Sequence, residues 1–110
     1  MIVYKIVPAA LWRASETAGL FHGSAVDTRD GFIHLSTAEQ VKETAARHFS
    51  GADDLLLVAV NRDNLDVRDE PSRGGDLFPH LYGALPMTSV AWVRALPIVD
   101  GTHVFPVLEP

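Results

Sequence analysis

Residues 30–40 read DGFIHLSTAEQ, and this stretch decides the fold class that the sequence predicts. The Asp-Gly pair is a turn signal, and the apolar residues that follow it predict a strand over Phe32–Leu35. Ser36 is a good helix N-cap, and Glu39, three residues further on, would complete a capping box. Behind this cap, apolar side chains recur at helical spacing before Gly51 ends the helix: Ala38, Val41, Ala45 and Phe49.

Further strands are predicted on both sides of this strand–helix unit. The continuous apolar run Leu55–Val60 is typical of a short strand buried on both faces. The other strand-like segments are Ile2–Val7, an edge strand around Leu65 and Val67, Phe78–Tyr82, Ser89–Leu96 and His103–Leu108. Ala9–Gly19 predicts a second helix, whereas residues 21–30 read as a polar loop. Because both helices fall in the first half, we predict an α+β fold with a split, mostly antiparallel sheet and two helices.

The composition indicates one small globular domain and excludes several kinds of chemistry. A chain of 110 residues has room for one core, so we expect a single domain over residues 1–110. Cysteine is absent from the sequence, which excludes disulfides and thiolate catalysis. Nine Lys and Arg against fourteen Asp and Glu give a net charge of −5, so nucleic acid is not an expected partner.

The sequence also lacks the patterns of membrane and export segments. The uncharged run Leu77–Val93 contains Pro79 and Pro86 and does not predict a bilayer span. Since no basic region precedes an apolar stretch at the N-terminus, we expect no signal peptide and a cytoplasmic protein. The oligomeric state stays open.

Two predicted strands carry nearly the same five-residue pattern, FIHLS at 32–36 and FPHLY at 78–82. Side chains alternate along a strand, so one face of each would present a ring, an imidazole and a hydroxyl: Phe32, His34 and Ser36, then Phe78, His80 and Tyr82. A cleft between these rows would stack a flat ring and hydrogen-bond a sugar or phosphate. Pro79 indicates an edge or irregular position for the second strand. The alternative is that both histidines are core imidazoles bonded to backbone carbonyls.

Three further residues are candidates for the site. Trp12 offers a stacking surface and Arg13 a planar fork for a phosphate, although a core Trp beside a solvated Arg is the plainer interpretation. Glu70 is a candidate general base or ribose anchor, against the alternative of a simply exposed carboxylate. The five histidines show no zinc-pair spacing, so no metal is expected.

The same residues carry a resemblance to a known family. Residues 30–40, with Trp12 upstream and FPHLYG at 78–83 downstream, closely resemble the bacterial domain of unknown function 952 family, over Tyr4 to Val93. More distantly, the order of the FIHLS strand, the helix to Phe49 and the next apolar strand is similar to that in RNA 2′-phosphotransferases. Those enzymes use NAD, carry a His-Val-His-Leu-Ser strand and have the ADP-ribosyltransferase fold. This second resemblance implies an ADP-ribosyltransferase-like split sheet with NAD in the cleft.

Two functions follow as hypotheses. The first is an NAD- or nucleotide-dependent transferase, with NAD, ADP-ribose or a related nucleotide as ligand. In it His34, His80 and Glu70 would be catalytic and five residues would bind substrate: Trp12, Arg13, Ser36, Phe78 and Tyr82. The second is a non-catalytic binding module, because Trp12-Arg13-Ala14 stands where those enzymes have His-Gly-Thr and no Glu lies in Ser89–Leu96. A structural domain with both histidines in the core is a third alternative.

Overall fold

The computed structural model describes the backbone of residues 1–110 and every side chain except that of Arg73. Its helices are α1 (Ala9–Ala18), α2 (Ala25–Asp30) and α3 (Val41–His48), with short 3-10 turns η1 (Arg73–Gly75) and η2 (Met87–Ser89). Its strands are β1 (Ile2–Pro8), β2 (Leu20–Phe21), β3 (Ile33–His34), β4 (Leu55–Asn61), β5 (Val67–Pro71), β6 (Leu77–Leu81), β7 (Leu85–Pro86), β8 (Val90–Ala95), β9 (Ile98–Val99) and β10 (Thr102–His103). Not one of the helices described is long and apolar enough to cross a bilayer.

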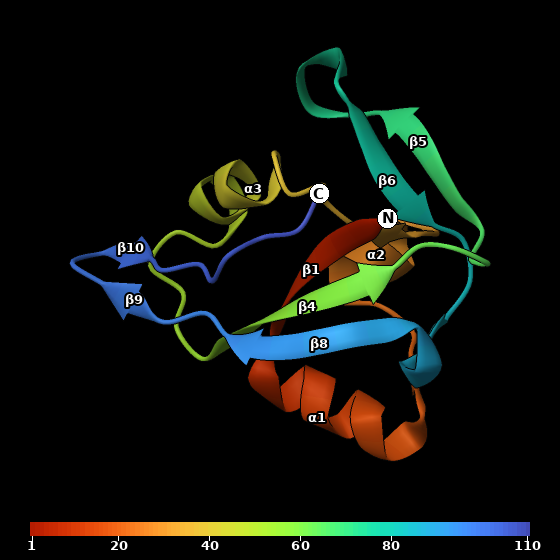
Figure 1. The fold of residues 1–110 in the computed structure, drawn as a ribbon, viewed down its shortest axis with the longest axis horizontal. Coiled ribbons are helices and arrows are strands. Elements are labelled where there is room, and N and C mark those ends of the chain that lie inside the picture. Colours follow the sequence, from red (N-terminus) through yellow and green to blue (C-terminus); the bar gives the residue numbers. More distant parts are fainter.

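Every strand pairing is antiparallel, which confirms the predicted α+β class and the antiparallel character of the sheets. The central sheet has the order β1-β4-β8 (Figure 1), and a second three-stranded sheet has the order β3-β6-β5. The pairs β2-β7 and β9-β10 complete the set. There are three helices rather than the predicted two.

The central sheet is covered on both faces, which explains the unbroken apolar run of β4. One face packs against Trp12 of α1 and against residues of β3 and β6, in a cluster that includes Val7, Val58 and Leu81. The opposite face packs against Val41 and Ala45 of α3. Because side chains on both faces of β4 are buried, the strand has apolar residues at successive positions instead of alternating apolar and polar ones.

The C-terminal segment crosses the α3 side of the central sheet. Tyr4 Oη donates to the Glu109 carbonyl at 2.9 Å and accepts from the Glu109 amide at 2.7 Å. Phe105 and Leu108 pack on the same core cluster as α3. The predicted strand over 103–108 is therefore wrong for most of its length: Thr102–His103 pairs with β9, the Val104 amide donates to the Pro97 carbonyl at 2.8 Å, and no strand continues beyond.

Two local predictions around the first histidine strand are also wrong. The predicted loop contains α2, because the Ser24 and Asp27 side chains form a capping box at its start. Ser36 is not a helix N-cap, since its backbone amide and carbonyl both bond Tyr4, at 2.9 and 2.7 Å. That bridge keeps Ser36 in an extended segment, and α3 begins only at Val41.

Pro79 lies in the central strand of the second sheet and not at an edge. On one side it stands opposite Asp69 of β5. On the other its carbonyl accepts a hydrogen bond from Leu35 at 3.0 Å, just beyond the short strand β3. A residue in an antiparallel strand directs its N–H and its C=O to the same neighbour. The missing N–H of Pro79 therefore falls where β3 ends, and costs the sheet little.

Candidate functional site

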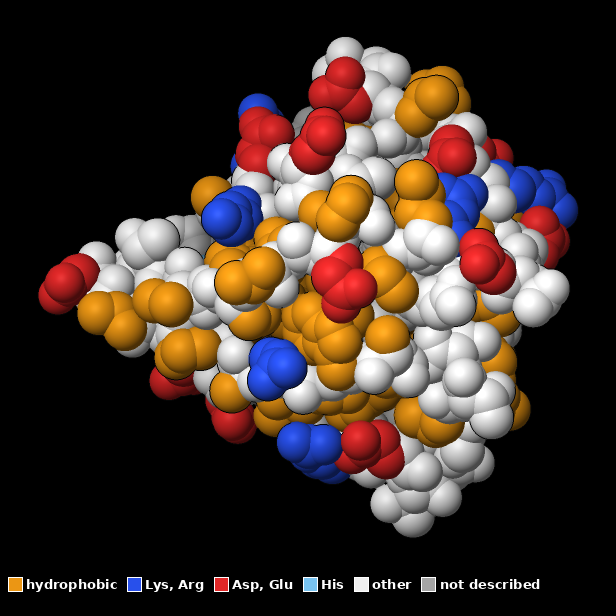
Figure 2. Space-filling view, in the orientation of Figure 1, with side chains coloured by type: hydrophobic (Ala, Val, Ile, Leu, Met, Phe, Trp, Pro, Cys, Tyr) orange, Lys and Arg blue, Asp and Glu red, His pale blue; other side chains and the backbone are white. Residues whose placement is uncertain are grey.

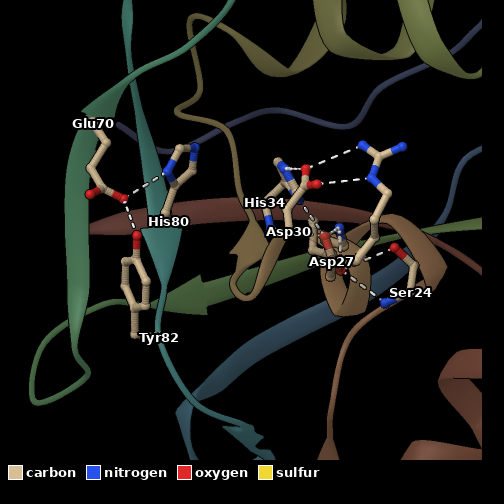
Figure 3. A network of polar contacts seen from close by, with 9 residues as sticks. Ser24, Asp27, Asp30, His34, Glu70, His80 and Tyr82 are labelled. Atoms are coloured by element: carbon tan, nitrogen blue, oxygen red, sulfur yellow. Dashed lines mark hydrogen bonds and ion pairs between the residues drawn. The ribbon is translucent and has the colours of Figure 1, made fainter.

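The structure brings the two predicted catalytic histidines together. β3 and β6 pair so that His34 stands directly opposite His80. Their ring centroids are 5.6 Å apart with an interplanar angle of 66°. The His34 side chain is 31% exposed, whereas that of His80 is only 5% exposed. Figure 3 shows the pair between two carboxylate groups, with Glu70 on the His80 side and the aspartates of α2 on the His34 side.

His34 is held between two aspartates of α2. Its Nδ1 lies 2.6 Å from Asp27 Oδ1, and its Nε2 lies 3.0 Å from Asp30 Oδ2. Ionised carboxylates only accept hydrogen bonds, so both contacts are hydrogen bonds when both ring nitrogens carry hydrogen. The two carboxylates thus hold the His34 ring in a fixed orientation.

Asp27 organises this half of the site from a buried position. Its Oδ2 accepts from the Ser24 amide and hydroxyl, and its Oδ1 accepts from the His34 amide. Lys5 Nζ, also buried, lies 2.9 Å from Oδ2. Burial alone would raise the pKa of Asp27, but the His34 hydrogen bonds and the Lys5 charge outweigh it and hold that pKa well below its ordinary value. Burial lowers the pKa of Lys5, against the opposing pull of Asp27.

His80 has a different set of partners. Glu70 Oε1 lies 2.9 Å from His80 Nδ1 and accepts the Tyr82 hydroxyl at 2.7 Å. The hydrogen bonds from Tyr82 and His80 lower the pKa of Glu70, and the bond to Glu70 raises the pKa of Tyr82. Because the ionised carboxylate accepts, Nδ1 of His80 carries hydrogen and a neutral ring has its lone pair at Nε2. Nε2 is buried and has no hydrogen-bond partner among the side chains and backbone that the structure describes.

Phe32 stands at the centre of the rings in the site. Its ring lies almost parallel to His80, at 4.0 Å between centroids and 20° between planes. The centroid of His34 is 4.6 Å away and that of Tyr82 is 5.5 Å away. Arg68 covers Tyr82 at 4.3 Å from its ring centroid. These rings, together with Glu70, give the site flat surfaces beside acid–base groups.

Four of the predicted substrate-binding residues lie elsewhere or are already bonded. Trp12 is 0% exposed and packs on Phe21, because α1 turns it into the core; it has no free face for stacking on a ligand. Arg13 is on the exposed side of α1 and pairs with Glu16 at 2.8 Å, and Figure 1 shows α1 at the opposite end of the molecule from β5 and β6. The Ser36 hydroxyl is buried against that of Thr44.

The fourth, Phe78, is buried on β6 opposite Glu70. Tyr82 is joined to the histidine pair through Glu70, which accepts its hydroxyl and bonds His80. The plainer interpretation of Trp12 and Arg13, a core Trp beside a solvated Arg, matches their placement.

The charged residues that hold His34 were not among the residues predicted from the sequence. The signals were present: Ser24 and Asp27 have the spacing of a capping box, and Asp30 follows Asp27 by three residues on the same helical face. Lys5 interrupts an otherwise apolar strand, and a lysine buried there needs a carboxylate partner.

A hollow of about 360 Å³ lies beside the site, lined by His22, Asp27, Thr28, Gly31, Phe32, Ile33, Gly83 and Ala84. Another, of about 340 Å³, lies between α3 and the β9–β10 hairpin, with no residue of the histidine pair in it. Among the described residues, no three His, Asp or Glu side chains are grouped so as to hold a metal ion. On the face in Figure 2, the described Lys and Arg side chains are scattered among Asp and Glu and form no continuous basic patch.

Comparisons with known proteins place the chain among uncharacterised relatives. A family model described as "Protein of unknown function (DUF952)" matches residues 6–93. The crystal structure of protein CC0527 from Caulobacter crescentus is 45% identical, with a TM-score of 0.89 over 94% of each chain. The solution NMR structure of CC0527 is 45% identical, with a TM-score of 0.84 over 93% of this chain and 90% of the other. Proteins with curated descriptions include no match.

Proposed function

The chain belongs to the DUF952 family, as its sequence resemblance predicted, and we propose that the His34–His80 centre binds and transforms a nucleotide of the NAD or ADP-ribose class. The observation that carries the proposal is the hydrogen bonding of the two His80 ring nitrogens. Its Nδ1 is fixed on Glu70, and its Nε2 is an unpartnered acceptor next to a cluster of rings. An oriented imidazole with a free nitrogen is the arrangement of a general base.

The rings support a ligand with a flat heterocycle. Tyr82 and the two imidazoles, whose ring centroids lie 4.0–5.5 Å from that of Phe32, provide stacking surfaces. Asp30, partly exposed beside the His34 ring, offers a carboxylate acceptor to a ribose hydroxyl. The choice of NAD and ADP-ribose within this class follows the resemblance of the strand at 32–36 to RNA 2′-phosphotransferases, with the ADP-ribosyltransferase-like fold that it implies.

With NAD as substrate, the reaction is transfer of the ADP-ribosyl group. The bond from ribose C1′ to the nicotinamide nitrogen breaks, and nicotinamide leaves neutral with the electron pair. An acceptor hydroxyl or water forms the new bond to C1′, and its proton moves to His80 Nε2. Glu70 stabilises the imidazolium that results. Asp27, Asp30 and Glu70 lie around the site and favour the positive charge that develops on the ribose.

A specific observation favours a second candidate, a non-catalytic binding module with the same ligand class. The His80 side chain is 5% exposed, so Nε2 meets a substrate only after a neighbouring side chain moves. In such a module, ligand would bind at the exposed edge of His34 and no product would form.

Thermal unfolding with and without NAD, ADP-ribose and AMP tests the proposal. A ligand at a hundredfold excess over Kd adds roughly 2.7 kcal/mol to the stability of the folded state, which raises the melting temperature measurably. Release of nicotinamide from NAD, followed by chromatography, separates the enzyme from the binding module. Glu70→Gln, which keeps the His80 ring but removes the charge that fixes it, should slow release and retain the melting shift, while Arg13→Ala, remote from the pair, should retain both. An unchanged melting temperature with all three ligands would refute the proposed ligand class.

A further inference from the structure

Among the four rings of the site, Phe32 differs from His34, His80 and Tyr82 in how its side chain is held. His34, His80 and Tyr82 are each anchored by a hydrogen bond to a carboxylate. The Phe32 side chain carries no polar group, and its ring contacts the three anchored rings. The three anchored rings thus form a box, and Phe32 is its occupant.

We propose that this box of His34, His80 and Tyr82 is the subsite for the ligand's heteroaromatic ring, and that Phe32 occupies it until the ligand displaces it. The inference rests on the proposed function and specifies where the base or nicotinamide ring binds. A planar ring in place of Phe32 would lie on the His80 ring, as Phe32 does at 4.0 Å and 20°. It would also meet the same ring neighbours, so the stacking lost with Phe32 is regained with the ligand.

The surroundings of Phe32 allow it to leave. Its ring is half-buried and lines the hollow of about 360 Å³ that opens beside α2. Gly31, with φ of +85°, precedes it directly and ends α2 in the left-handed region. The hollow therefore offers space next to the present position of the ring.

Displacement of Phe32 by a ligand would also bring a polar partner to His80. Nε2 of His80 is buried and has no hydrogen-bond partner among the described residues. A buried nitrogen without a hydrogen bond destabilises the folded protein. A nucleotide whose ring replaces Phe32 would carry its ribose beside His80, where a ribose hydroxyl can donate to Nε2 and relieve that cost.

Calorimetric titration of Phe32→Ala with AMP and with nicotinamide mononucleotide tests the proposal. If Phe32 competes with the ligand, its removal makes binding about five- to tenfold tighter, the equivalent of about one aromatic pair. Phe105→Ala, which removes a ring on the α3 side of the sheet, is the matched control and should leave Kd unchanged. Weaker or equal binding by Phe32→Ala would show that Phe32 is a wall of the site and overturn the proposal.

A measurement on the unaltered protein covers the case in which Phe32→Ala does not fold. The nuclear Overhauser contact between the Phe32 and His80 rings should be strong in the free protein and vanish when AMP saturates it. Its persistence in the saturated protein overturns the proposal while leaving the ligand class intact. Absence of binding by AMP, nicotinamide mononucleotide, NAD and ADP-ribose alike overturns both proposals.

Discussion

His34 and His80 stand opposite each other in paired strands, yet their ring nitrogens are used in opposite ways. Both nitrogens of His34 meet carboxylates, whereas His80 meets one and leaves the other free of any described partner. The first arrangement engages both nitrogens of the ring, and the second leaves one nitrogen available to a ligand. Two equivalent positions in neighbouring strands therefore supply an anchored ring and a candidate base.

Glu70→Gln should lower the pKa of the Tyr82 phenol. The hydrogen bond to Glu70 is the main reason that the pKa of Tyr82 is raised, and glutamine keeps an oxygen but loses the charge. Ultraviolet titration of the phenolate measures the change in a Tyr4→Phe background, where Tyr82 is the single tyrosine left. An identical midpoint before and after the Glu70→Gln change would contradict the Glu70–Tyr82 bond.

Asp27→Asn should destabilise the protein strongly, by about 3–5 kcal/mol, because it leaves Lys5 buried without a countercharge. Chemical denaturation measures the free energy of unfolding. The double variant with Lys5→Met should lose less than the sum of the single variants. Additive losses would show that the two side chains do not interact.

Lowering the pH should decrease the free energy of unfolding through protonation of Asp27. Its pKa is lower in the folded state than in the unfolded state, so the unfolded chain takes up the proton first as the pH falls. The stability that Asp27 contributes is full above about pH 4 and declines below it. Denaturation at a series of pH values should show the free-energy gap between wild type and Asp27→Asn closing as the pH falls. A constant gap would be the contrary result.

Trp12→Ala and Arg13→Ala should separate a core residue from a surface residue. Loss of the fully buried Trp12 ring should cost about 3–5 kcal/mol of unfolding free energy. Arg13, paired only with Glu16 on the surface of α1, should change stability by less than about 0.5 kcal/mol. Reduced ligand binding by Arg13→Ala, measured as a melting shift, would restore the binding role that the sequence predicted for it.

The histidine pair could be predicted from the sequence because period-two alternation is a local property. The matching strings at 32–36 and 78–82 place an imidazole at the same point of each strand, and β3 and β6 pair in that register. Alternation along a strand does not show which residues from other segments bury a side chain. The sequence therefore predicts Trp12 and Ser36 in the site, whereas tertiary contacts bury Trp12 in the core and direct Ser36 to Thr44.

The partners of the pair escaped prediction because they depend on contacts between distant segments. Lys5 and Asp27 come from β1 and α2, and only the folded chain brings their charges within 2.9 Å. Glu70 was a candidate from sequence alone, but its bonds to His80 and Tyr82 depend on the pairing of β5 with β6.

Because β3 is short, the backbone around His34 should open locally more readily than the central sheet. Only Ile33 and His34 pair with β6, and Pro79 ends the ladder beyond them, whereas β1 and β4 pair over seven residues. The His34 amide donates a hydrogen bond to the Asp27 carboxylate at 3.0 Å, and this bond protects the amide from exchange. Native-state deuterium uptake should therefore reach the amides around His34 well before those of β4, and sooner still in Asp27→Asn.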